Sequence, residues 1–276
     1  MKKLYLECYA GVSGDMTVGA LLDLGADPET LRAGLASLPL EGYQVRISRV
    51  KKSGLDACDF HVILDDAHEN HDHDMEYLYG HLRAHDHSHE HDHTHEHDHT
   101  HAHEHEHRGL AEILDIIEAS GITDHAKEIA AHVFHILGKA EAKAHGTSLE
   151  EVHFHEVGAV DSIVDIVAAA ICLDDLGLSD VIVSPLAEGK GTVRCQHGIL
   201  PIPVPAVTHI LAEHSLPVKQ TQIVGELITP TGAALMAAVG TEFTLPEQYT
   251  IKAVGLGAGK RNYDTSGVVR AMILDA

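Results

Sequence analysis

The segment from residue 85 to residue 107 carries histidine at every odd-numbered position. The residues between these histidines are Asp, Glu, Ser, Thr and one Ala, so the segment has no large apolar side chain. A segment of this composition cannot bury enough apolar surface to form a packed core. Because polar, low-complexity sequence extends from about residue 67 to residue 108, we expect a disordered insertion that interrupts a folded chain.

The same segment points to metal handling. Imidazole nitrogens and carboxylate oxygens are ligands for nickel, copper and zinc. The segment alone does not distinguish a protein that stores a metal from one that delivers it or uses it. The accessory metal ligands predicted here are His85, His87, His89, His91, His93, His95, His97, His99, His101, His103, His105 and His107.

Composition excludes several classes of protein. The 276 residues include 42 acidic and 19 basic ones, a net charge of -23, so binding to nucleic acid or to an anionic membrane is not expected. No apolar run is long enough to span a membrane, and no secretory signal is visible. The four cysteines are scattered and form no CxxC pair, which argues against a disulfide framework. We therefore expect a cytoplasmic protein.

Hydrophobic periodicity predicts interleaved strands and helices. The fold class expected is α/β or α+β, with a mixed sheet flanked by helices and the histidine-rich insertion between them. The chain is divided into an N-terminal α/β segment at 1–66, the insertion at 67–108, and the remainder of the catalytic-type domain at 109–276. The expected strands are 2–9, 43–50, 56–64, 181–184, 249–254 and 267–273, and the main expected helices are 16–24, 123–145, 162–176, 206–213 and 233–239.

The densest group of possible metal ligands is His153-Phe154-His155-Glu156, followed by Asp161. In an extended segment His153 and His155 point to the same side, and a turn at Gly158 would bring the carboxylates near them. Two imidazoles with carboxylates suit nickel, zinc or iron. The alternative is that Asp161 caps the next helix and the histidines are ordinary surface groups.

Two glycine-containing loops are candidates for binding an anionic substrate. In the first loop, Ser13 and Asp15 stand between a strand and a helix, where backbone N–H groups can face an anion. Plain helix capping by Ser13 or Asp15 is the alternative. The second loop carries Lys190, Arg194 and His197, which could hold a phosphate or carboxylate, although a simple hairpin also explains its glycines.

A third glycine-rich stretch, 255–261, resembles a phosphate loop only superficially. A Walker motif needs Gly at position 254, where this chain has Val254, and Ser or Thr after Lys260, where it has Arg261. Nucleotide binding is therefore not expected there. Thr229-Pro230-Thr231-Gly232 is typical of a helix start and indicates nothing more by itself.

Four ordered segments together resemble the LarC family: 11–25, 153–167, 189–207 and 229–236. The resemblance runs from about residue 3 to residue 273 and implies nickel insertion into pyridinium-3,5-bisthiocarboxylic acid mononucleotide, which yields the nickel-pincer cofactor. It implies a CTP-dependent cyclometallase, a lyase that bonds nickel to two sulfurs and a pyridine carbon. Family members continue beyond the point matched by Ala276, so the chain resembles their N-terminal portion, and CTP with Mg or Mn is expected only with the C-terminal part.

The implied partners are the pyridinium mononucleotide, the C-terminal LarC portion, and apoenzymes of the lactate racemase type downstream; a homo-oligomer is also expected. We assign His153, His155 and Glu156 to metal or base roles with Asp161 in support. Substrate contacts are assigned to Ser13, Asp15, Lys190, Arg194 and His197. The alternative function is nickel storage or delivery without catalysis. A zinc hydrolase ranks last, because the chain has no H-E-x-x-H motif.

Overall fold

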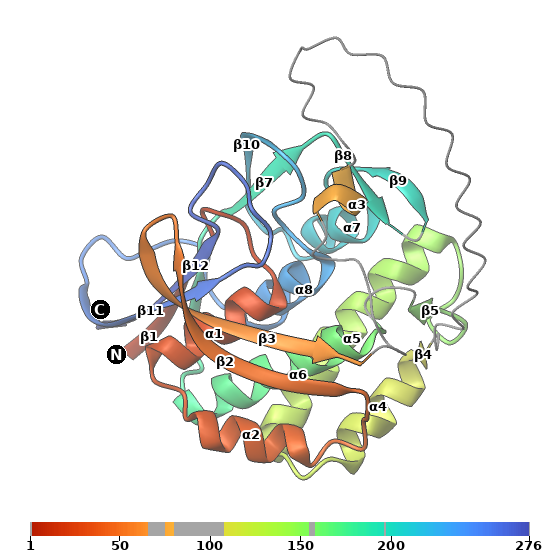
Figure 1. Ribbon diagram of the computed structural model, residues 1–276, viewed down its shortest axis with the longest axis horizontal. Helices are drawn as coiled ribbons and strands as arrows, with labels where there is room; N and C mark the ends of the chain where they lie inside the picture. Colours follow the sequence, from red (N-terminus) through yellow and green to blue (C-terminus); the bar gives the residue numbers. More distant parts are fainter. Residues whose placement is uncertain (1, 66–74, 80–107, 155–157, 196, 276) are drawn as a thin grey trace, which may run out of the picture.

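A computed structural model describes residues 2–65, 75–79, 108–154, 158–195 and 197–275 (Figure 1). Its largest sheet has six strands in the order β2-β3-β11-β12-β1-β6. The strands are β1 (Lys2–Glu7), β2 (Tyr43–Lys52), β3 (Leu55–Leu64), β6 (Val181–Val183), β11 (Thr250–Ala258) and β12 (Val268–Asp275). The sheet is mixed, because β1 runs antiparallel to β12 and parallel to β6.

Helix α1 (Gly14–Leu24) packs against the sheet at unusually close range. The reason lies in Gly255 and Gly257 of β11. A Cβ atom on Gly257 would lie 1.9 Å from the carbonyl oxygen of Met16, and one on Gly255 would lie 2.3 Å from the backbone nitrogen of Leu24. The glycines that resemble a phosphate loop in the sequence therefore serve backbone packing of a helix on a strand.

A second layer of helices covers α1. Helix α6 (Val160–Leu176) contacts α1 and α2 (Pro28–Ala36), and it also packs against α5 (Asp124–His145). Helix α5 in turn contacts α4 (Leu110–Ala119), α7 (Pro205–Glu213) and α8 (Pro230–Val239). These faces are rich in Ala, Val, Ile and Leu, so helices approach closely around one large core.

Short elements complete the described part of the chain. Helix α3 (Met75–Tyr79) is a single short segment. Small two-stranded sheets pair β7 (Leu186–Lys190) with β10 (Val218–Val224), β4 (Arg108–Gly109) with β5 (His153–Phe154), and β8 (Thr192–Cys195) with β9 (Gly198–Pro201). In the helices that the structure describes, no stretch has the length and apolar character needed to cross a membrane.

The expected fold class is confirmed: a mixed sheet is flanked by helices. Strands from 1–66 and from 109–276 pair in one sheet, as the register of Lys2 with Asp275 shows. The predicted histidine-rich insertion falls almost entirely outside the described residues. The helix expected from residue 16 begins at Gly14, and the first strand ends at Glu7 rather than at residue 9.

Candidate functional site

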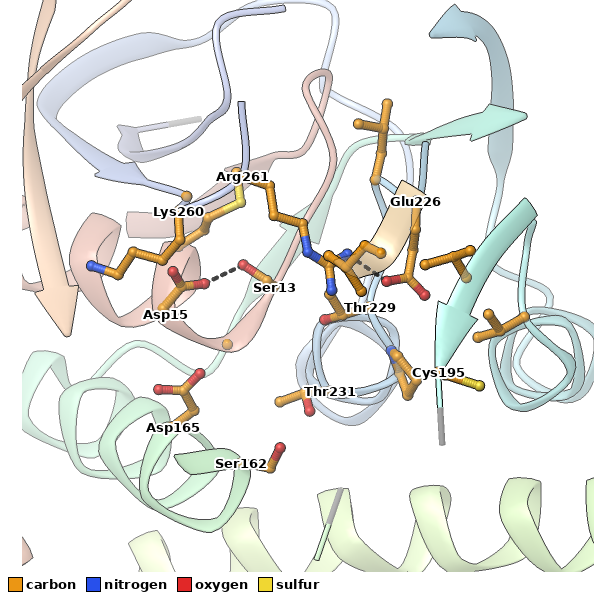
Figure 2. A pocket seen from close by; sticks show the side chains of 18 of the residues that line it. Ser13, Asp15, Ser162, Asp165, Cys195, Glu226, Thr229, Thr231, Lys260 and Arg261 are labelled. Carbon is orange, nitrogen blue, oxygen red and sulfur yellow. Dashed lines mark hydrogen bonds and ion pairs between the residues drawn. The ribbon is translucent and has the colours of Figure 1, made fainter. Parts of the chain in front are cut away.

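A cavity of about 290 Å³ is lined by the first turns of four helices, α1, α6, α7 and α8 (Figure 2). The other walls come from β3, the end of α5, the β8–β9 hairpin and the segment after β11. The first-turn residues that line the cavity are Gly14 and Asp15 of α1, Asp161 and Ser162 of α6, Pro205 and Ala206 of α7, and Pro230 and Thr231 of α8.

Converging helix starts favour an anionic ligand. The first N–H groups of a helix have no partner within the helix, and its dipole places partial positive charge at that end. Three of these four starts have no cap from the side chain of the N-cap residue, which is Val204 in α7. Ser13 occupies the N-cap position of α1, but its Oγ donates to the carboxylate of Asp15. The N-cap residue of α6 is Ala159. The capping interpretations of Ser13 and Asp161 are therefore wrong.

Two adjacent cations, Lys260 and Arg261, follow β11 and line the same cavity (Figure 2). Lys260 forms an ion pair with Asp59 of β3, and Nη1 of Arg261 lies 2.5 Å from Oε2 of Glu226. Burial opposes the charge of Arg261, but Glu226 and two tyrosines outweigh this effect and raise its pKa above the ordinary value. Both cations are largely buried, so water screens their charges only weakly.

Three carboxylates, Asp15, Asp161 and Asp165, line the cavity between α1 and α6. Burial raises the pKa of Asp165 well above its usual range, and the charges of Asp15 and Asp161 raise it further. Asp15 is only 7% exposed, and its Oδ2 has no hydrogen-bond partner among the described residues. A carboxyl group with a raised pKa in a cavity is suited to accept or donate a proton.

Four further lining residues form what we term the mixed-donor cluster: Glu141, His145, Cys195 and His197. Oε2 of Glu141 lies 3.4 Å from Nε2 of His145, one helical turn along α5. The ring centroids of His145 and His197 are 4.8 Å apart, and Sγ of Cys195 lies 3.9 Å from Nδ1 of His197. Helix α5 and the β8–β9 hairpin thus bring together side chains that are about 50 residues apart in sequence.

Most of the predicted site residues that the structure describes lie on this cavity. Its lining includes Ser13, Asp15, Asp161, Arg194 and His197. Lys190 is not part of the lining, and its Nζ instead lies 2.7 Å from Oε1 of Gln222.

The predicted metal site at His153, His155 and Glu156 stays a prediction. The backbone of His153 pairs with Gly109 in a short strand, but its side chain, His155 and Glu156 lie outside the described residues, as do the predicted ligands from His85 to His107. Among the residues that the structure does describe, no group of three or more His, Cys, Asp or Glu side chains has its donors converged on one point.

Sequence reasoning missed the two cations and most of the mixed-donor cluster. The sequence interpretation treats Lys260 and Arg261 only as part of a stretch that fails the Walker pattern, and adjacent cations also occur at Lys2-Lys3 and Lys51-Lys52, so their adjacency gives no signal. Glu141 and His145 stand at i and i+4 on a long helix, a spacing that places both on one face. That spacing was the available signal, but only the fold shows that this face meets Cys195.

The fold and the site together define an α/β protein whose cavity places helix starts and two cations beside carboxylate, imidazole and thiol groups. A family model described as nickel insertion protein matches residues 4–276, so the chain belongs to the nickel insertion protein family. No solved structure matches the chain.

Curated relatives agree with the family match. The chain is 49% identical to the pyridinium-3,5-bisthiocarboxylic acid mononucleotide nickel insertion protein of Alkaliphilus metalliredigens, over 99% of this chain and 60% of the relative. It is 45% identical to the protein of the same name from Clostridium acetobutylicum, over 99% of this chain and 64% of the relative. The chain therefore spans roughly three fifths of the length of the relatives that it matches.

Proposed function

We propose that this chain binds pyridinium-3,5-bisthiocarboxylic acid mononucleotide in the cavity and contributes the residues that insert nickel into it. The observation that carries the proposal is the convergence of four helix starts with Arg261 and Lys260 on one cavity. A mononucleotide with a phosphate and two thiocarboxylates is strongly anionic, so it needs such a site. The volume of about 290 Å³ lies near the lower end of the range for small-molecule sites.

The cavity also suggests how the residues divide the work. The guanidinium of Arg261 and backbone N–H groups at the start of α1 would hold the phosphate. A base must take the ring proton when nickel bonds to carbon, and the raised pKa of Asp165 makes its carboxylate a stronger base than usual. Asp15 and Asp161 flank Asp165 and would assist it through their charge. Nickel in this scheme is a substrate, and it must be held by ligands that release it.

The family resemblance extends the proposal to the class of reaction, its cellular location and the proteins that receive the cofactor. The reaction would be that of a cyclometallase of the lyase class in the cytoplasm, with lactate racemase-type apoenzymes as recipients. CTP with Mg or Mn would act on the part of the longer relatives that this chain does not cover. A homo-oligomer would fit the same scheme.

Titration calorimetry of the full chain with the mononucleotide tests the proposal. We expect one binding site, weakened at least about tenfold in Arg261→Lys because the bidentate fork is lost. Arg270→Lys is the matched control, since Arg270 is exposed on β12 and pairs with Glu7 outside the cavity lining. Lys260→Gln is a second test variant if Arg261→Lys unfolds. Absence of binding, or equal binding by all variants, would overturn the proposal.

A further inference from the structure

The mixed-donor cluster combines the atoms that borderline metal ions prefer. It offers one sulfur from Cys195, imidazole nitrogens from His145 and His197, and carboxylate oxygens from Glu141. Divalent nickel, copper and zinc bind such N/S/O sets, whereas magnesium and calcium prefer oxygen alone. The cluster lies on the wall of the cavity that we propose for the mononucleotide, so a metal held there would be close to its acceptor.

Cys195 differs from the other cysteines in a way that suits this role. Cys8, Cys58 and Cys172 are buried, whereas Cys195 is partly exposed on the cavity wall. Burial raises the pKa of Cys58 to about 11 and also raises the pKa values of Cys8 and Cys172. The buried thiols therefore stay protonated at neutral pH, and thiolate is the form that binds metal.

We propose that Cys195, His197 and His145 form the site at which nickel enters the cavity, with Glu141 holding His145 in place. This assignment rests on the proposed function, because it takes nickel to be the metal substrate. The donors are paired rather than converged in the structure, so nickel binding requires side-chain rotations that bring them onto one ion. Binding replaces the Cys195 S–H bond with an S–Ni bond and releases the proton to solvent.

The geometry also suits release of the metal. A site with a single thiolate holds nickel less firmly than a cage of several thiolates, and partial exposure leaves room for an incoming ligand. The two thiocarboxylates of the mononucleotide would offer competing sulfur atoms. Transfer would then exchange one nickel–sulfur bond to Cys195 for bonds to the substrate, and no electron transfer is required.

Titration of the full chain with nickel chloride under anaerobic conditions tests this site. Bonding to Cys195 should produce a near-ultraviolet thiolate-to-nickel absorption band whose final amplitude corresponds to one nickel–thiolate bond per chain. Residues 85–107 contain histidine but no cysteine or methionine, so nickel bound to that segment cannot produce this band. We expect Cys195→Ser to abolish the band, and His197→Ala and His145→Ala each to raise its half-saturation concentration at least about tenfold.

His135→Ala is the matched control, because His135 is exposed on the same helix α5 and does not line the cavity. The absorption band of His135→Ala should have the same amplitude and half-saturation concentration as that of the wild type. Nickel K-edge absorption should show a sulfur ligand in the wild type and none in Cys195→Ser. A wild type without the band, or a band that survives in Cys195→Ser, would overturn the site.

A parallel measurement of mononucleotide binding distinguishes failure of the nickel site from failure of the proposed function. If the band is absent while the mononucleotide still binds with dependence on Arg261, the nickel site fails and the proposed function stands. If the band behaves as expected but the mononucleotide does not bind, the proposed function fails and the metal site stands.

Discussion

Gly14 and Asp165 lie in direct contact across the cavity wall, with no room for a side chain at residue 14. A Cβ atom on Gly14 would lie 2.6 Å from Oδ2 and 2.7 Å from Cβ of Asp165. The contact joins the start of α1 to α6 and sets the position of the carboxyl group that we propose as the base. The spacing between these two helices is therefore tied to the geometry of the site.

Gly14→Ala tests this relationship. The added methyl group must push Asp165 away or separate α1 from α6, and overpacking of this kind costs about 1–3 kcal/mol. We expect that loss in the free energy of unfolding in urea, together with weaker binding of the mononucleotide. Gly109→Ala is the control, because the nearest atom to its added Cβ would be 3.8 Å away. Equal stability of the two variants would contradict the prediction.

Glu188 gives the protein a dependence of stability on pH. The residue is fully buried, and its Oε1 accepts hydrogen bonds from the backbone N–H groups of Gly189, Leu227 and Ile228. Burial raises its pKa to about 7, against an ordinary value of 4.5. Because the folded state holds the proton more tightly than the unfolded state, stability from Glu188 is present below pH 4.5 and is lost as the pH rises to about 7.

Glu188→Gln should remove this dependence. Glutamine keeps an acceptor for the backbone N–H groups and carries no ionisable group. We expect the stability of the variant relative to wild type to increase by about 2–3 kcal/mol between pH 4.5 and pH 7.5. Urea denaturation at both pH values measures the difference. Parallel pH profiles for the two proteins would show that Glu188 does not titrate in this window.

Lys52 is expected to position the two cavity cations without touching the ligand. Its Nζ donates to the carbonyl oxygens of Gly259 and Arg261 and to Oδ1 of Asn262, each at 2.8 Å. These bonds hold the segment that carries Lys260 and Arg261. Lys52→Met should weaken mononucleotide binding about tenfold, which corresponds to about 1.4 kcal/mol.

The neighbouring lysine supplies the control for that experiment. Lys51 is 73% exposed, and its nearest ion pair is a 3.9 Å contact with Asp56. Lys51→Met removes the same charge without releasing the segment after β11. Calorimetry should show unchanged binding for Lys51→Met, and an equal loss in both variants would indicate a general charge effect instead of positioning.

Local signals in the sequence were enough to predict many of the elements. The helix expected at 123–145 is observed as α5, and the side chain of Thr123 caps it by accepting from the backbone N–H group of Ala126. Gly146 ends α5 in the left-handed conformation that glycine adopts readily. Such signals act within a few residues, so they can be recognised without knowledge of the fold.

The sheet order and most of the site depend on contacts that are distant in sequence. Pairing of Lys2 with Asp275 places β1 inside the sheet, and no local pattern specifies that register. The meeting of His145 with His197 likewise depends on how α5 packs beside the hairpin. The loop before a helix could be recognised as a candidate anion site from local sequence, and the structure places its Ser13 in the cavity lining, although contact with substrate stays a prediction.

Asp165 should reduce the stability of the protein near neutral pH. A residue kept for function can lower stability in this way, whereas a structural residue would raise it. Burial and the charges of Asp15 and Asp161 raise its pKa, so its contribution to stability is largest in acid and falls as the carboxyl ionises. Asp165→Asn removes the charge and retains the shape. We expect the variant to be more stable than wild type in urea at pH 8 and to lose this advantage at pH 4, while nickel insertion by the complete system falls.

Ser162→Ala, a change on the same helix that leaves the carboxylates intact, should show no such pH-dependent difference. A variant less stable than wild type at pH 8 would mean that the ionised carboxylate stabilises the fold, and Asp165 would then be a structural residue.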